Sequence, residues 1–74
     1  MDITYDPAKN ERNIRERGLS FERAADFDFR TAILSVDTRR DYGEIRQVAL
    51  GHLYGRLHVL CFMETDVGIR VISF

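Results

Sequence analysis

One glutamate and two arginines in the second half of the chain have the residue types needed to cleave a phosphodiester. Glu44 and Arg46 stand two positions apart, and Arg70 lies near the end of the sequence. Cleavage of RNA needs a base for the ribose hydroxyl and positive charge for the phosphorus centre; Glu44 can be the base, and Arg46 and Arg70 can clamp the phosphate. The alternative is a surface ion pair worth about 0 to 1 kcal/mol, which spacing alone favours.

The segment over residues 7–17, which we predict to be a helix, contributes a second group of polar residues. Lys9, Asn13 and Arg17 stand four positions apart, so they share one face of a helix. We consider Lys9 and Arg17 as candidates to hold an RNA backbone. A solvated helix face is the alternative for all three.

The histidines and the cysteine do not form a metal site. His52 and His58 lie six positions apart and Cys61 is alone, which is no recognisable set of zinc ligands. Either histidine could act as a general acid, but we expect structural roles for both. Cys61 lies in the apolar run LHVLCFM and is expected to be buried as a small hydrophobic residue.

The composition bounds the size and the partners of the protein. Its 74 residues, 45% of them hydrophobic, suffice for one domain over residues 1–74 and leave no room for a cofactor domain. With one cysteine no disulfide can form within the chain, so we expect a homo-oligomer or a tight partner. The net charge of -1 is unlike that of a general nucleic-acid binder, although ten of the eleven basic residues are arginine and suit a phosphate.

The N-terminus, MDITYDPAKN, lacks the basic start and the apolar stretch of a secretion signal. The longest apolar run is far short of the roughly 20 residues that a membrane span needs. We therefore expect a soluble, cytoplasmic protein without a membrane partner.

The order of predicted elements is that of an α+β domain. A short strand over residues 2–5 leads to a helix over 7–17, which Asp6-Pro7 starts and Gly18 ends; Ser20 caps a second helix that begins at Phe21. From Thr31 the pattern indicates four strands in an antiparallel meander, within the segments TAILSVD, EIRQVALGHL, LHVLCFME and IRVISF.

The turns set a register that gathers the polar residues. If Tyr54-Gly55 is a two-residue turn, Arg46 lies opposite Met63, and a turn at residues 65–68 puts Met63 opposite Arg70. Glu44 then points to the same face of the sheet as both arginines.

Both faces of this sheet are predicted to be apolar, so we infer that something packs on the uncovered one. One face would carry Ala49, Leu60, Phe62, Ile69 and Val71, and the other Val48, Leu50, Val59, Cys61, Ile72 and Phe74.

Two stretches of the chain resemble the BrnT family of toxins. YDPAKNERNIRERGLSFERAADFDF resembles its N-terminal signature, and GEIRQVALGHLYGRLHVLCFME with IRVISF resembles its Glu-x-Arg strand, its Gly-Arg-Leu hairpin and its last strand. The resemblance implies a RelE-like fold and an endoribonuclease activity without a metal. It also implies a BrnA-like ribbon-helix-helix antitoxin as partner, RNA as substrate, and DNA binding only indirectly through the antitoxin.

The sequence departs from the family pattern in two places. Arg17 stands where the family commonly has histidine, so no proton-transfer role is carried over to it. The family's last strand continues into a basic C-terminal helix, which we expect this chain to lack because it stops at Phe74. A catalytically silent domain that only binds an antitoxin-like protein is therefore the alternative function.

Overall fold

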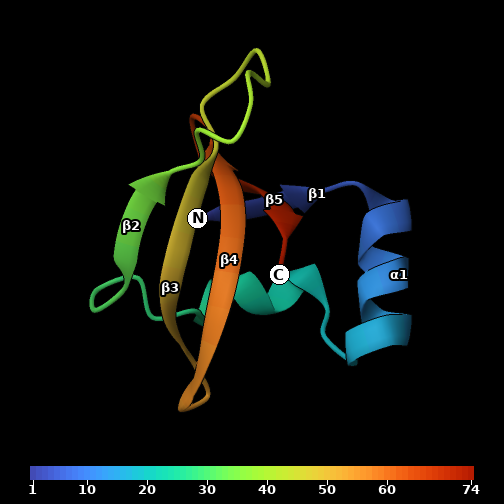
Figure 1. Ribbon diagram of the computed structural model, residues 1–74. Helices are drawn as coiled ribbons and strands as arrows, with labels where there is room; N and C mark the ends of the chain where they lie inside the picture. The colour runs from blue at the N-terminus through green and yellow to red at the C-terminus, as the bar shows by residue number, and fades with distance from the viewer.

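The computed structural model describes residues 1–74, which form one sheet, one α-helix and one 3₁₀ helix (Figure 1). The strands are β1 (Asp2–Tyr5), β2 (Ile33–Val36), β3 (Gln47–Leu53), β4 (Arg56–Glu64) and β5 (Gly68–Ser73). The helices are α1 (Pro7–Arg17) and η1 (Phe21–Asp26). The α+β class predicted from the sequence is confirmed.

The sheet differs from the predicted four-stranded antiparallel meander. Strands β2 to β5 do follow one another as antiparallel neighbours, but β1 adds to β5 in parallel and gives a five-stranded mixed sheet of order β1-β5-β4-β3-β2. Pairing with β5 satisfies backbone groups that a lone four-residue strand would leave open. The two strands lie at opposite ends of the chain, and no local spacing signals such a contact.

Both predicted helix starts are present. The Asp6 carboxylate accepts a hydrogen bond from the Ala8 amide at 2.9 Å, and Gly18 ends α1 with a φ of 66°. The Ser20 hydroxyl accepts a hydrogen bond from the Glu22 amide at 3.2 Å. The second helix is a short 3₁₀ segment. It ends before Phe27, because the backbone of that residue is extended.

The predicted register is confirmed. Tyr54 and Gly55 have φ values of 51° and 77°, as a two-residue hairpin turn with two left-handed residues requires. The pairing runs from Leu53 opposite Arg56 to Gln47 opposite Phe62, and Met63 lies opposite Arg70. One further step of the first pairing puts Arg46 opposite Met63.

The face predicted for Phe74 is wrong. The pairing of β4 with β5 shifts between Cys61 and Phe62, where Cys61 lies opposite Ser73 but Phe62 lies opposite Val71. This irregularity inserts one residue into β5 and reverses the alternation after Val71. Phe74 is therefore buried with the core rather than beside Cys61.

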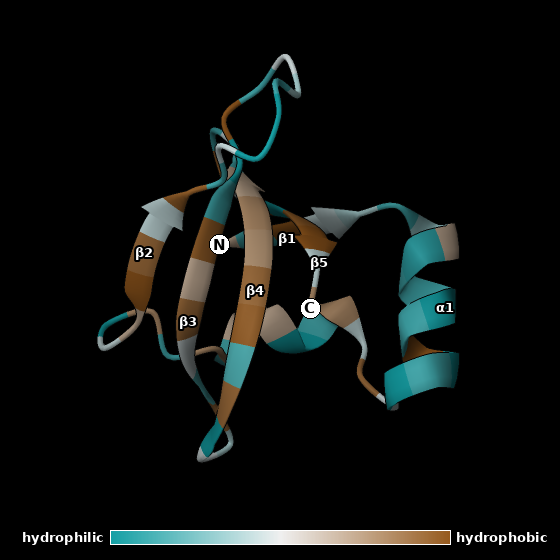
Figure 2. Ribbon diagram, viewed as in Figure 1, coloured by the Kyte–Doolittle hydropathy of each residue, from teal (hydrophilic) through white to brown (hydrophobic).

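The core lies on one face of the sheet, under η1. It joins Phe21 and Ala24 of η1 to the inward side chains of the strands and of Phe74. The other face, which we call the open face, carries exposed apolar side chains. They come from β2, β3 and β4, whose ribbons include hydrophobic residues in Figure 2. Ile33, Leu50, Leu57 and Val59 are among them. Cys61 lies on this face but is buried, as predicted, and burial raises the pKa of its thiol.

Helix α1 stands beside the sheet and is attached mainly through polar contacts (Figure 1). The buried side-chain oxygen of Asn10 accepts a hydrogen bond from the Phe21 amide at 2.7 Å. The side-chain amide of Asn13 donates to the Leu19 carbonyl at 2.9 Å. These bonds fix the helix against the turn that leads into η1.

Candidate functional site

A polar cluster orders the loop that connects β2 to β3. Nε and Nη2 of Arg39 donate to the two carboxylate oxygens of Asp37 at 2.9 and 2.8 Å, and the Tyr42 hydroxyl donates to the same carboxylate at 3.1 Å. The Asp37 side chain is only 2% exposed. These bonds, those from Arg39 first, hold the pKa of Asp37 well below its usual range.

The loop cluster positions Arg46. Its guanidinium carbon lies 4.0 Å from the centre of the Tyr42 ring, a cation–π contact, and its Nε donates to the Glu44 carboxylate at 3.0 Å. The backbone of Arg46 is fixed as well, since its carbonyl accepts a hydrogen bond from the Asp37 amide at 2.8 Å. The structure thus brings Glu44 and Arg46 together as an ion pair.

Arg70 does not belong to that ion pair. It lies on β5 opposite Met63, on the same face as Arg46, and its side chain is exposed. The backbones of the two arginines are two strand spacings apart, about 10 Å across the sheet. Arg70 forms no hydrogen bond or salt bridge with Glu44 or Arg46. Arg46 and Arg70 share a face of the sheet, as predicted. A phosphate held by both would have to span the distance between their strands.

The surface beside Glu44 is a shallow groove of about 360 Å³. Its other lining residues are Ile45, Gln47, Met63 and Glu64. Glu64 adds a second carboxylate at this position, which opposes the approach of a phosphate from that side.

The predicted RNA-binding residues of α1 lie in two different hollows. Lys9 lines a groove between α1 and the end of β5, together with Asn13. Arg17 lines a separate cavity, and its Nη1 donates to the backbone oxygen of Phe74 at 3.2 Å. The two cations share a helix but face different parts of the fold.

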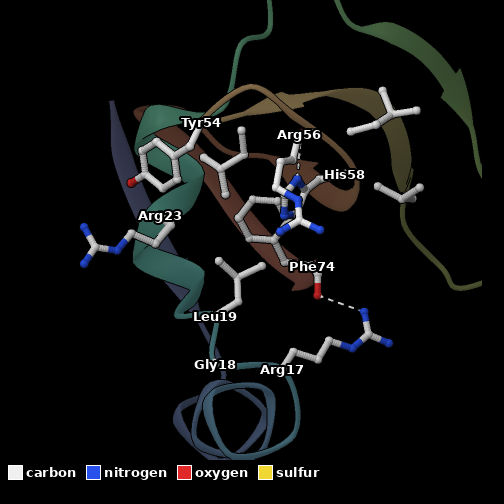
Figure 3. A pocket seen from close by; sticks show the side chains of 11 residues that line it. Arg17, Gly18, Leu19, Arg23, Tyr54, Arg56, His58 and Phe74 are labelled. Carbon is white, nitrogen blue, oxygen red and sulfur yellow. Dashed lines mark hydrogen bonds between the residues drawn. The ribbon is translucent and has the colours of Figure 1, made fainter.

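The cavity that Arg17 lines has a volume of about 580 Å³, and arginines from three elements line it. Figure 3 shows that the Arg23 side chain extends beside Tyr54, away from Arg17 and Arg56. Arg17 comes from α1, Arg23 from η1 and Arg56 from the start of β4. His58 and Tyr54 also line it, and none of its eleven lining residues is acidic. It lies at the β3–β4 turn, at the opposite end of β3 from Glu44 and Arg46.

The ring of His58 is held in one orientation. Its Nδ1 lies 2.9 Å from the Arg56 carbonyl, which can only accept, so Nδ1 carries the proton and Nε2 is left for other partners. The ring packs on Phe74, with centroids 5.7 Å apart (Figure 3). His52 lies on the open face and does not line this cavity.

The sequence interpretation missed Arg23, Arg56 and His58 as a group. Alternation along β4 does place Arg56 and His58 on one face, and this was the available signal. Nothing in the spacing of the sequence indicates that Arg17 and Arg23 join them.

The comparisons with known proteins give one match. A family model described as "Ribonuclease toxin, BrnT, of type II toxin-antitoxin system" matches residues 5–74. The chain belongs to the BrnT family. No match was found among curated proteins or among solved structures, so the RelE-like fold remains a prediction.

The chain thus belongs to the ribonuclease toxins of type II toxin–antitoxin systems, a class that implies an antitoxin as partner and RNA as substrate. Neither helix has the length and hydrophobicity to cross a lipid bilayer. No three histidine, cysteine or acidic side chains are grouped so that they could hold a metal ion.

Proposed function

We propose that this BrnT-family chain is a metal-independent endoribonuclease that acts in the cytoplasm and uses Glu44, Arg46 and Arg70. The observation that carries the proposal is the Glu44–Arg46 ion pair, with a 3.0 Å contact, on the face of the sheet that also bears Arg70. This arrangement supplies one carboxylate and two permanent cations at the same end of the sheet.

The chemistry follows from these residue types. Glu44 accepts the proton of the ribose 2′-hydroxyl, whose oxygen attacks the adjacent phosphorus. Arg46 and Arg70 stabilise the negative charge on the phosphoryl oxygens as the bond to the 5′-oxygen breaks. The proton that Glu44 has accepted passes through water to the leaving 5′-oxygen, which gives a 2′,3′-cyclic phosphate and a 5′-hydroxyl end. Lys9 and Arg17 hold the RNA backbone outside the reacting phosphate.

We further propose that a BrnA-like ribbon-helix-helix antitoxin neutralises the chain, and that any DNA contact is made by the antitoxin. The exposed apolar side chains of the open face support a protein partner, because monomeric proteins seldom leave such a patch uncovered. In the absence of the antitoxin, a second copy of the chain would cover this face in a homo-oligomer.

The open face also favours the second candidate function. A chain that only binds an antitoxin-like protein would need this face and no catalytic residues. The two functions differ in whether RNA is cut.

The test is cleavage of RNA by the purified chain with an excess of metal chelator. We expect internal cuts with 2′,3′-cyclic phosphate ends, and inhibition by the antitoxin. The variant Glu44→Gln should lose about 100-fold or more of the activity, whereas Glu64→Gln in the same groove should keep it. In cells, induced expression should stop growth unless the antitoxin is present. Intact RNA with a folded, antitoxin-binding chain would establish the silent interaction domain instead.

A further inference from the structure

The cavity at the β3–β4 turn is lined by positive charge in a protein whose net charge is -1. Its ionised lining residues are Arg17, Arg23 and Arg56, and it contains no acidic residue. The chain as a whole has eleven basic and twelve acidic residues. A hollow lined by cations and by no acidic residue attracts an anion.

Of the three arginines, Arg56 is the one left available. Arg17 donates to the Phe74 backbone oxygen and Arg23 lies beside the Tyr54 hydroxyl, whereas the Arg56 side chain forms no hydrogen bond or salt bridge. The nearby Asp26 does not line the cavity, and its carboxylate accepts a hydrogen bond from the Tyr54 hydroxyl. A planar guanidinium binds a phosphate through two oxygens at once.

The cavity also offers ring surfaces. Tyr54 is 63% exposed at the tip of the hairpin, and the ring of His58 is half-buried against Phe74. Unstacked bases of single-stranded RNA bind to rings of this kind, while an acidic peptide would use only the cations. The combination of arginine and aromatic side chains therefore favours a nucleotide.

We propose that this cavity binds one nucleotide of single-stranded RNA, with its phosphodiester at Arg56 and its base on the ring of Tyr54. The proposal rests on RNA being the substrate of this chain and adds a holding site that is separate from the cleavage site. The length of β3, about 20 Å, separates the cavity from Glu44 and Arg46. Binding here anchors the RNA at a distance from the bond that is cut.

The experiment measures binding of a fluorescent 2′-O-methyl RNA oligonucleotide, which has no attacking hydroxyl and cannot be cleaved. The variant Arg56→Ala should bind at least about 10-fold more weakly than the wild type. Its plot of log affinity against log salt should be flatter by about 0.7 for each phosphate that the variant no longer neutralises. The matched control, Arg30→Ala, removes an exposed arginine outside the cavity and should change affinity less than about twofold.

A third variant tests the ring contact. Tyr54→Asn tolerates the left-handed backbone at this position but has no ring, so binding should weaken about 5-fold or more. Circular dichroism checks the fold of each variant, and Arg56→Gln replaces Arg56→Ala if the alanine variant does not fold.

The outcomes separate this inference from the proposed function. Cavity-dependent binding by a wild-type chain that cuts no RNA would support the holding site and refute the nuclease proposal. Equal binding by wild type and Arg56→Ala would overturn the holding site, even if both cut RNA. Unchanged RNA binding with weaker antitoxin binding would overturn it as well, and would assign the cavity to an acidic segment of the antitoxin.

Discussion

At the scale of single residues, Arg70 separates the catalytic proposal from an ordinary ion pair. Replacing it with alanine leaves the contact between Glu44 and Arg46 intact, because Arg70 lies two strands away. If the three residues act together, Arg70→Ala should lower RNA cleavage by about 100-fold or more. The free energy of unfolding should change by less than about 1 kcal/mol, because the side chain is exposed.

The measurement is the cleavage rate of wild type, Arg46→Ala, Arg70→Ala and the double variant. The double variant should lose little beyond the worse single one, because residues of one catalytic unit are not additive. Unchanged cleavage after replacement of both arginines would leave only a surface ion network at this face.

Asp37 gives a prediction for pH. Hydrogen bonds from Arg39 hold its pKa below the usual value, so the folded chain takes up the proton at a lower pH than the unfolded chain does. The stabilising contribution is therefore complete above about pH 4, the ordinary carboxyl value, and is lost as the pH falls below it. Asp37→Asn should be less stable than wild type at pH 7 and should lose less stability between pH 7 and pH 3.

Denaturant unfolding of both proteins at the two pH values checks this. Asp28, whose pKa is also lowered, mainly by a hydrogen bond from Thr31, stays in the variant and leaves it part of the pH dependence. The same loss of stability on acidification in both proteins would contradict the role given to Asp37.

At the scale of elements, Gly51 lets the segment after η1 lie against β3. A Cβ at this position would come within 2.8 Å of the Phe27 ring and 2.9 Å of the Ala32 methyl group. Gly51→Ala should therefore force the segment away and lower the free energy of unfolding by about 1 to 3 kcal/mol. Denaturant unfolding measures the change, with Ser35→Ala on the exposed strand β2 as a control. A change within about 0.5 kcal/mol in Gly51→Ala would mean that this packing is loose.

At the scale of the whole molecule, the open face predicts self-association. Ile33 and Val59 on that face are 70% and 54% exposed, and β2 has a free outer edge. Without its antitoxin the chain should form dimers or larger species at tens of micromolar, as measured by light scattering. Ile33→Lys/Val59→Lys should be monomeric, whereas Val67→Lys at the turn between β4 and β5 should still associate. A wild-type chain that stays monomeric would show that the open face needs no cover.

The sequence by itself determined those features that neighbouring residues decide. Asp6-Pro7 and Gly18 set the ends of α1. The turns at Tyr54-Gly55 and at residues 65–68 together set the register that puts Arg46 and Arg70 on one face. Capping groups and left-handed turn residues act within a few positions, so their spacing is sufficient evidence.

Only the tertiary structure decided the features that depend on distant segments. The pairing of β1 with β5, the irregularity that buries Phe74, and the gathering of Arg17, Arg23 and Arg56 around one cavity all join parts of the chain far apart in sequence. Such contacts arise from how the sheet and the helices pack as a whole. Local patterns give the type of each element, whereas packing determines which charged side chains meet.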